Sequence, residues 1–231
     1  MIKLTAKVCQ ITLGLVNAFL IESDGLTLVD TGFKGSADSI FKAITKGGKN
    51  PKDIKRVILT HLHKDHAGSA AEIKRRLNVP VLAHEADAPL IEKGAGGRAS
   101  NTGSPGLLNW LAFNLFVKGA PMDTEPVRVD QQLKDQQVLD IAGGIEIIHT
   151  PGHSKGHIAL LLPEEKLLIA GDLCANIFGL GLSVIYEDVE AAKRSIKKVA
   201  DLDFDKAVFG HGSPIRGRAG LKFKKLHHTF R

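Results

Sequence analysis

The sequence predicts an α+β domain in which two packed sheets are flanked by helices. In each half of the chain, short apolar and β-branched runs, which predict strands, are followed by an amphipathic run of helical spacing, which predicts a helix. No motif repeats with a period of about 20 to 50 residues, which argues against a solenoid. With 231 residues, 43% of them hydrophobic, the chain can bury the core of such a domain.

The first strands and helix are expected before residue 50. Residues 2–30 predict three strands, because KLTAKVCQI, LVNAFLIES and GLTLVDTG are rich in apolar and β-branched residues. Asp24-Gly25 predicts a hairpin turn, since glycine accepts positive φ. Residues 36–48 predict a helix that Ser36 can cap and Gly47-Gly48 ends. A strand at 55–60, a helix at 70–78 and a strand at 79–84 continue the alternation.

Residues 85–136 interrupt this alternation. They predict a variable helical and loop insertion within a single domain of residues 1–231. Inside the insertion, LLNWLAFNLFVKG predicts an unusually apolar helix around Trp110. Apolarity on all sides indicates that something covers this helix. A core or subunit contact is favoured over a lid on a pocket, and a homodimer is therefore one hypothesis about partners.

The second half of the chain repeats the pattern of strands and a helix. Strands are expected within residues 136–150, 156–163, 166–172 and 207–212, and a helix at 188–202. The C-terminal stretch RGRAGLKFKKLHHTFR is basic and contains no acidic residue, and the net charge of the chain is +6. A solvated helix face is the favoured interpretation. Attraction of an anionic substrate or of nucleic acid is the alternative.

The remaining composition predicts a cytoplasmic protein without a membrane partner. Cys9 and Cys174 lie far apart and form no CxxC pair, so buried thiols are expected rather than a disulfide framework. The chain does not start with a charged and then apolar signal-like segment, and it has no run of about eighteen apolar residues.

Polar residues that can bind metal ions follow four of the apolar runs. VILT leads to His61, IIHTPG to His153, LLIAG to Asp172 and AVFG to His211. Such groups are rarely buried without a partner, so core packing does not explain them. We expect them to converge at one edge of the two sheets.

The stretch THLHKDHAGS, residues 60 to 69, adds three more candidates. In an extended segment His61, His63 and Asp65 share one face, whereas His66 points elsewhere unless the chain turns. This arrangement can serve two metal ions with one short loop. Two such ions can share a hydroxide for a hydrolytic displacement, and Asp172 is the candidate to bridge them.

The combined pattern resembles the metallo-β-lactamase superfamily. Its HxHxDH signature stands here at residues 61–66, and its later ligands match His153 in TPGHSKGH, Asp172 in IAGD and His211 in FGHG. VNAFLIESDGLTLVDTG is also similar to the opening strands of the family, so the resemblance covers nearly the whole chain. It implies the metallo-β-lactamase fold, a four-layer αββα sandwich.

The resemblance implies two divalent metal ions held by seven ligands: His61, His63, Asp65, His66, His153, Asp172 and His211. His61, His63 and His153 would hold one ion, Asp65, His66 and His211 the other, with Asp172 between them. Asp30 matches a family aspartate that supports the ligands by hydrogen bonding. Asp65 is the expected catalytic residue, which orients or deprotonates the attacking water. Zn(II) is expected from the nitrogen and oxygen donors, with Fe or Mn as alternatives.

The other histidines are expected to have different roles. His149 lies inside a strand and is interpreted as a structural histidine. His84, His227 and His228 are expected to be non-ligands. His157 follows His153 by four residues and is a candidate to line the pocket.

The resemblance implies a hydrolase of the glyoxalase-II or lactonase-like branch. A metal-bridging hydroxide would cleave a small ester, thioester or lactone, and its substrate-binding residues are not assigned. Leu173-Cys174-Ala175 departs from lactonases, which have a tyrosine after the bridging aspartate. The glyoxalase-II type has basic residues and a tyrosine near its C-terminal region, whereas Arg216, Arg218 and Lys222 lack the tyrosine here.

Two other functions are alternatives to this hydrolase. A phosphodiesterase or phosphatase is the first, with the basic tail attracting a small anionic substrate. A non-catalytic metal-binding module is disfavoured, because seven ligands for two ions leave positions for water. Nucleic acid is disfavoured as a partner, because the chain has a single Tyr for stacking on bases and no large inserted domain.

Overall fold

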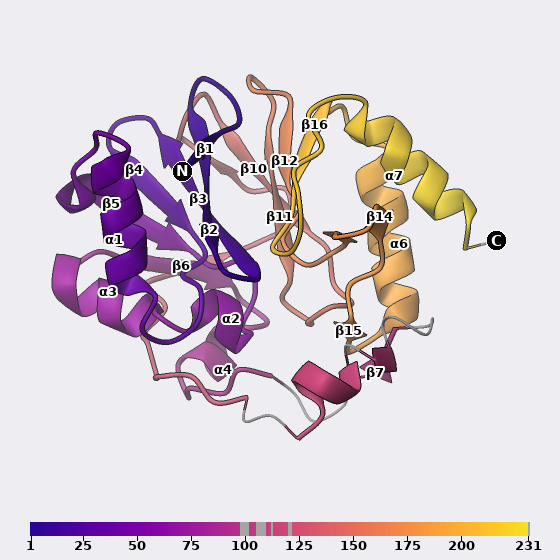
Figure 1. The fold of residues 1–231 in the computed structure, drawn as a ribbon, viewed down its shortest axis with the longest axis horizontal. Coiled ribbons are helices and arrows are strands. Elements are labelled where there is room, and N and C mark those ends of the chain that lie inside the picture. Colours follow the sequence, from indigo (N-terminus) through magenta and orange to yellow (C-terminus); the bar gives the residue numbers. More distant parts are fainter. Residues whose placement is uncertain (98–101, 105–109, 112, 120–121, 231) are drawn as a thin grey trace.

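Two β-sheets pack face to face, and helices cover the outer face of each sheet (Figure 1). The computed structural model describes residues 1–97, 102–104, 110–111, 113–119 and 122–230. The layers follow in the order helices, sheet, sheet, helices. The αββα sandwich expected from the sequence is therefore confirmed.

The first sheet has seven strands in the order β1-β2-β3-β4-β5-β6-β8. Neighbours from β1 to β4 are antiparallel, whereas β4, β5, β6 and β8 run parallel to one another. The strand expected at residues 3–11 is divided, because the chain turns where Leu4 and Thr5 both donate backbone N–H bonds to Val8 O. The bounds are β1 Ile2–Lys3, β2 Val8–Leu13, β3 Val16–Glu22, β4 Leu26–Val29, β5 Ile54–Ile58, β6 Val81–His84 and β8 Gln131–Leu133.

The second sheet has five strands in the order β16-β12-β11-β10-β9. Only β12 and β16 pair in parallel within it. The strand expected within residues 136–150 is two strands, because Ala142, Gly143 and Gly144 take positive φ and turn the chain. The bounds are β9 Val138–Leu139, β10 Ile145–His149, β11 Ile158–Leu162, β12 Leu167–Ile169 and β16 Lys206–Val208.

Helices α1 (Ala37–Lys46) and α3 (Ala70–Leu77) cover the first sheet, and α6 (Val189–Ala200) and α7 (Ala219–His228) cover the second (Figure 1). Ser36 takes the cap position of α1, but its side chain makes no capping bond. The shorter elements are η1 Pro51–Asp53, α2 Lys64–Ala67, α4 Ala88–Ile91 and η2 Phe113–Val117, with strand pairs β7 Thr102–Gly103 and β15 Ile185–Tyr186, and β13 Ala175–Asn176 and β14 Leu180–Gly181.

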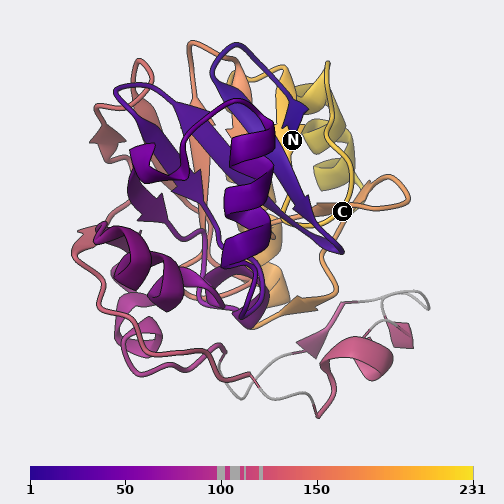
Figure 2. The ribbon, with the colours of Figure 1, turned by 60° about the vertical axis from the view of Figure 1, so that its left-hand side comes forward.

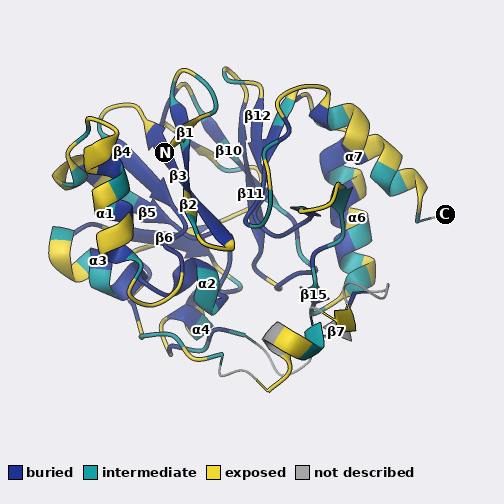
Figure 3. Ribbon diagram, viewed as in Figure 1, coloured by how far each residue is buried: buried dark blue, intermediate teal, exposed yellow. Residues whose placement is uncertain are grey.

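Three apolar clusters hold the layers together, and Figure 3 shows that the strands are largely buried. Ile40 of α1 and Ile73 of α3 belong to the first cluster, and Phe19 and Ile147 belong to the second, between the sheets. Phe223 of α7 belongs to the third. Burying each such side chain contributes about 1.5–3 kcal/mol. The two sheets are thus held in a fixed relative position, so residues at their common edge are also held in fixed positions.

The described parts of the segment between α4 and β8 lie at one end of the molecule (Figure 1 and Figure 2). Within it, Trp110 is 58% exposed and Leu115 is 73% exposed, so the described part of the expected apolar helix is not a core helix. Residues 105–109, 112 and 120–121 lie outside the described residues, and the subunit contact stays a prediction. Among the described residues no helix is long and apolar enough to cross a membrane.

His84 and His149 form a stacked pair that joins the two sheets. Their rings are parallel within 11° and their centroids lie 4.0 Å apart. Ala86 N–H donates to His84 Nδ1, and His149 Nε2 lies 2.8 Å from the carbonyl oxygen of Lys155. Burial and the facing His149 lower the pKa of His84 from 6.5 to about 4. The pair is a structural contact and lies outside the clustered histidines and carboxylates.

This pKa predicts a pH dependence of stability. Between about pH 4 and pH 6.5 the unfolded chain binds a proton at His84 that the folded protein does not bind. The free energy of unfolding therefore falls as the pH drops through this window. We expect urea titrations to show a smaller fall for His84→Phe, which keeps a ring against His149. Equal falls in the variant and the natural protein would contradict this account.

Candidate metal centre

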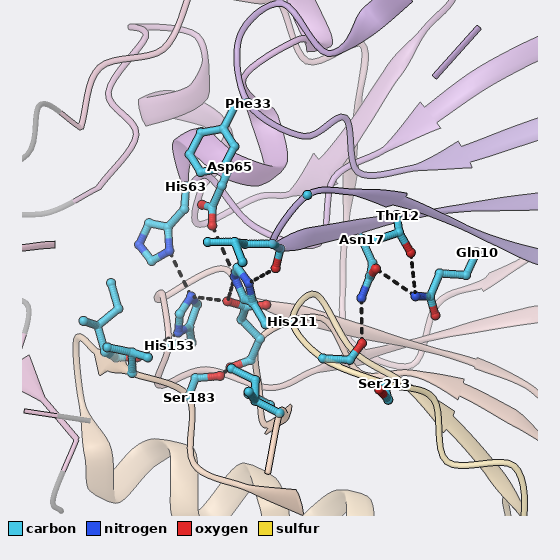
Figure 4. A pocket seen from close by; sticks show the side chains of 18 of the residues that line it. Gln10, Thr12, Asn17, Phe33, His63, Asp65, His153, Ser183, His211 and Ser213 are labelled. Carbon is cyan, nitrogen blue, oxygen red and sulfur yellow. Dashed lines mark hydrogen bonds and ion pairs between the residues drawn. The ribbon is translucent and has the colours of Figure 1, made fainter. Parts of the chain in front are cut away.

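The predicted site residues lie together at one edge of the two sheets. His61 follows β5, His153 follows β10, Asp172 follows β12 and His211 follows β16. Parallel strands such as β12 and β16 end at the same edge, so loops far apart in the chain meet there. Figure 4 shows His63, Asp65, His153 and His211 converging.

The chain turns within residues 61–66, which is the alternative to an extended segment that the sequence left open. The segment is not extended beyond His63, because the chain turns into α2 at Lys64. Backbone N–H groups of His66 and Ala67 donate to His63 O, which closes this turn. The backbone N–H and hydroxyl of Thr31 both bond to His66 O at 2.7 Å and hold the turn in place. Asp65 and His66 are thus directed by helical geometry rather than by alternation along a strand.

Three histidines form the first group. His153 Nε2 lies 2.9 Å from His63 Nδ1 and 3.2 Å from His61 Nε2. His153 Nδ1 must carry a proton, because it donates to the carbonyl oxygen of Ile185 at 2.8 Å. Thr60 gives its hydroxyl proton to Asp30 and so accepts from His61 Nδ1–H at 3.0 Å. The Nε2 atoms of His61 and His153 are therefore two acceptors that face each other.

The second group contains the carboxylate of Asp65, and a further carboxylate, Asp172, joins it to the first group. Asp65 Oδ2 lies 3.2 Å from His211 Nε2 and 3.7 Å from His66 Nε2. Asp172 Oδ2 lies 3.2 Å from His211 Nε2 and 3.5 Å from His153 Nε2, and its Oδ1 lies 3.5 Å from His66 Nε2. Asp172 thus contacts both groups, in the position between them that the sequence predicts.

The donor atoms fit metal ions. Three sets of ligand atoms lie within 4.8 Å of one another: His61, His63 and His153; His61, His66 and Asp172; Asp65, His66 and His211. His66 Nε2 and Asp172 Oδ1 are buried and have no hydrogen-bond partner among the described residues. Facing acceptors and unpartnered buried atoms are costly unless a cation lies between them.

The carboxylates of the cluster would also be stabilised by nearby positive charge. Burial disfavours a charged ring, yet Asp172, Asp65 and Asp30 raise the pKa of His66 to about 9. Against the same effect of burial, Asp172 and Asp65 raise the pKa of His211 well above its ordinary value. Metal ions would supply this charge without protons. Elsewhere in the cluster, burial and the neighbouring His153 lower the pKa of His63 to about 3.

Asp30 supports one histidine of each group. Its carboxyl accepts from the backbone N–H and the hydroxyl of Thr60, each at 2.8 Å, and from His66 Nδ1–H at 2.9 Å. Through the Thr60 hydroxyl it also orients His61. Such partners fix the tautomer and direction of a metal-binding ring. The sequence did not reveal Thr60, whose hydroxyl carries this connection.

Asn17 holds the loop that carries His211, and sequence reasoning missed it. Its side-chain amide donates to the carbonyl oxygens of Phe209 and Gly212, each at 3.0 Å, and its backbone N–H donates to Gly210 O at 2.8 Å. In the same hairpin, Leu15 O accepts from His211 Nδ1–H at 2.8 Å. The sequence signal that could have revealed Asn17 is an amide within the apolar run VNAFLI, and the structure shows that this residue is buried.

Position 210 requires a glycine, because the backbone there lies very close to the side chains of Asp172 and His66. A Cβ atom there would lie 2.0 Å from Asp172 Oδ1 and 2.6 Å from His66 Cε1. Any larger residue would displace the carboxylate that joins the two groups. This explains the glycine before His211 in the sequence FGHG.

The remaining histidines lie outside the cavity wall. His157 was a candidate to line the pocket, but it lies behind the cluster, where Asp172 N–H donates to its Nε2 at 2.9 Å. Its Nδ1 lies 2.8 Å from the Thr150 hydroxyl, so His157 supports the backbone at Asp172. His227 and His228 belong to the end of α7, on the outer face of the second sheet (Figure 1).

A cavity of about 710 Å³ opens onto the cluster. Five of the seven predicted ligands line it: His63, Asp65, His153, Asp172 and His211. From the segment 85–136, the described residue that lines it is Met122. Arg216 lies elsewhere and donates to the backbone oxygen of Lys3 at 3.3 Å. A molecule in the cavity would therefore meet the cluster directly.

Comparison with known proteins identifies the family. The model of the metallo-β-lactamase superfamily matches residues 11–211. The chain belongs to this superfamily. Together with the clustered histidines and carboxylates, membership identifies the protein as a metal-dependent hydrolase.

Proteins similar to this superfamily member come from several organisms. It is 27% identical over 227 residues to "Probable metallo-hydrolase YflN" of Bacillus subtilis, covering 90% of this chain and 84% of the relative. A metallo-β-lactamase family protein from Thermus thermophilus superposes with a TM-score of 0.75 at 25% identity, covering 99% of this chain and 80% of the other. BJP-1, a subclass B3 metallo-β-lactamase of Bradyrhizobium japonicum, shares the fold with a TM-score of 0.73 at 22% identity, covering 99% and 91% of the two chains.

The role of Asn17 can be tested by metal binding. Replacing it with leucine leaves the carbonyl groups of Phe209 and Gly212 without their donors and frees the His211 loop. We expect zinc affinity at the group that contains His211 to fall by about 10- to 100-fold, as for other partners of metal ligands. Titration against a chromophoric chelator would measure the two binding steps separately.

Thr12→Val is the matched control. Thr12 pairs with Asn17 across the β2–β3 hairpin, and its hydroxyl accepts from Gln10 rather than bonding to the carbonyls of the His211 loop. The variant should retain both binding steps. Equal weakening of both steps in Asn17→Leu would indicate general destabilisation instead.

Proposed function

We propose that the protein uses two divalent metal ions to hydrolyse small esters, thioesters or lactones. The observation that carries this proposal is that the cluster forms part of a cavity wall instead of being enclosed. A structural metal site is usually closed by four protein ligands. Here members of both groups, together with Asp172 between them, line space that a substrate can enter.

The ligand assignment follows the two groups. His61, His63 and His153 would hold one ion, Asp65, His66 and His211 the other, and Asp172 would lie between them. All donors are nitrogen or oxygen, which favours Zn(II), with Fe or Mn as alternatives that metal analysis would distinguish. The buried Cys174 contributes no sulfur to the candidate groups, and burial raises the pKa of its thiol. Asp30 would hold His61 and His66 in position.

When bound, the two ions would polarise the substrate carbonyl and lower the pKa of a water molecule between them. The chain's own contribution begins with Asp65, whose carboxylate lines the cavity. Burial opposes its ionisation, but His66 and His211 hold its pKa well below the usual range. It therefore stays an acceptor that orients a water molecule toward the carbonyl, which places the attacking oxygen correctly.

A phosphodiester is the second candidate substrate. Two metal ions can clamp such a group, and the side chain of Lys64 lines the cavity beside Asp65. Phosphodiesters are anionic, however, and the cavity wall contains no arginine among the described residues. The carbonyl substrates are therefore preferred.

The proposal predicts loss of activity with loss of metal. Removing the ions with a chelator should abolish hydrolysis of p-nitrophenyl acetate, and two equivalents of zinc per chain should restore it. A panel of a thioester, a lactone and bis-p-nitrophenyl phosphate would rank the substrate classes. A single tightly held zinc ion without any hydrolysis would support the non-catalytic module.

Asp65 provides the mutational test. Asp65→Asn should lower kcat/KM by about 10²- to 10⁴-fold, because an amide has one acceptor oxygen instead of two and no negative charge with which to orient the water molecule. Asp203→Asn is the control, since that side chain is 87% exposed and pairs with Lys166 on the surface. Full activity of Asp65→Asn in the zinc-loaded protein would refute the assigned role.

A further inference from the structure

We propose that the cavity selects an uncharged substrate that carries an apolar chain. This inference rests on the proposed hydrolase and names the class of substrate within it. The wall beyond the metal cluster is mainly apolar and comes from separate parts of the chain. The apolar lining residues are Ile2, Leu15, Phe33, Met122, Ala175, Ile177, Val184, Ile185 and Pro214.

Among the described residues, the charged ones that line the cavity all belong to the cluster or to the 61–66 segment. They are Lys64, Asp65, Asp172 and the three histidines His63, His153 and His211. The basic C-terminal stretch supplies none of the charged lining residues, and α7 packs against α6 on the outer face of the second sheet. A carboxylate on the substrate would find Lys64 as its single cationic partner outside the histidines of the described wall. A charge buried without a good partner is costly.

Several apolar side chains at the cavity are exposed to water. Leu15 is 76% exposed, Ile177 55% and Phe33 43%, and all three line the cavity. Single exposed apolar residues are ordinary, but a group of them around one cavity marks a binding surface. Covering them with an apolar chain would remove this surface from water.

The arrangement places the apolar surface beside the reacting centre. Phe33 lines the same cavity as Asp65 and His63 (Figure 4). Leu15 belongs to the hairpin that holds His211, and its carbonyl bonds to that ring. A chain attached to the scissile carbonyl would therefore contact apolar residues as soon as the carbonyl reaches the cluster. This is why we assign the surface to substrate and not to a second copy of the protein.

The neutral polar residues of the wall are consistent with an uncharged ligand. Gln10 Nε2 donates to Asn17 Oδ1 at 2.8 Å and to Thr12 Oγ1 at 3.2 Å. Because the Asn17 amide nitrogen is committed to two carbonyls, its oxygen must face Gln10. The orientation of these amides is thus fixed, and they present dipoles rather than net charge to this part of the cavity.

Binding of a non-hydrolysable ligand gives the first test. The probes are the methyl ketones 2-pentanone, 2-heptanone and 2-nonanone, each displacing Nile red from the zinc-loaded protein. Full burial of a methylene group contributes a factor of about four, so we expect affinity to rise about two- to fourfold for each added methylene. An affinity that does not change with chain length would overturn the proposal.

Hydrolysis of matched esters gives the second test. p-Nitrophenyl hexanoate and the mono-p-nitrophenyl ester of adipic acid have the same chain length and differ by a terminal carboxylate. We expect kcat/KM to be at least about tenfold higher for the hexanoate, because the carboxylate has few partners. Equal or better hydrolysis of the adipate would overturn the proposal.

Ile177→Asp tests the wall itself. It places a charge at an exposed loop position between β13 and β14, and we expect the increase in affinity per methylene to fall to less than about half its natural value. Leu221→Asp is the matched control, because Leu221 is 56% exposed on α7 and does not line the cavity. It should retain the natural dependence on chain length, and an equal loss in both variants would contradict the assigned surface.

The two proposals fail in distinguishable ways. Ketones that bind according to chain length, together with no ester hydrolysis, would retain the apolar site and refute the hydrolase. Ester hydrolysis that shows no chain-length dependence would retain the hydrolase and refute the apolar site.

Discussion

The hydrogen bonds of the buried Asp30 carboxyl are the interaction on which the rest of the site depends. Asp30 follows β4 with a φ of 61°, and its backbone N–H donates to Ile58 O of the neighbouring strand β5. Its side chain then receives three hydrogen bonds from Thr60 and His66. One carboxyl thereby joins two parallel strand ends and directs a histidine of each candidate metal group. Loss of such a buried acceptor would leave several donors unpaired at once.

The site also requires that the loops that follow distant strands keep fixed positions relative to one another. Each sheet contributes part of the cluster, and the apolar layer between the sheets fixes their relative position. The β2–β3 hairpin adds a contact across the edge, because Asn17 and Leu15 hold the loop of His211. The hairpin also forms part of the cavity wall. The same segment therefore positions a metal ligand and shapes the space for substrate.

Charge is distributed very unevenly around this site. The net charge of the chain is +6, yet the basic C-terminal helix α7 lies on the outer face of the second sheet, away from the cavity. In the part of the cavity wall that the structure describes, the charged groups are the cluster and the neighbouring Lys64, and the other lining residues are apolar or neutral. An overall basic sequence thus does not imply an anionic substrate, because the relevant field is the one at the cavity wall.

The sequence by itself determined the order of the strands and helices in outline, the fold family and the seven residues that converge at the sheet edge. The order of elements follows from local patterns, because apolar runs define strands and a polar residue after a run lies at a strand end. The fold family and the full set of seven residues follow instead from the resemblance to the metallo-β-lactamase superfamily that the HxHxDH motif carries. The tertiary structure decided the turn of α2 after His63, the supporting roles of Thr60 and Asn17 and the position of His157 behind Asp172. It also decided the apolar character of the cavity. The reason is physical: these features depend on contacts between segments as far apart as Asn17 and Gly212, and local spacing does not specify which side chains such contacts bring together.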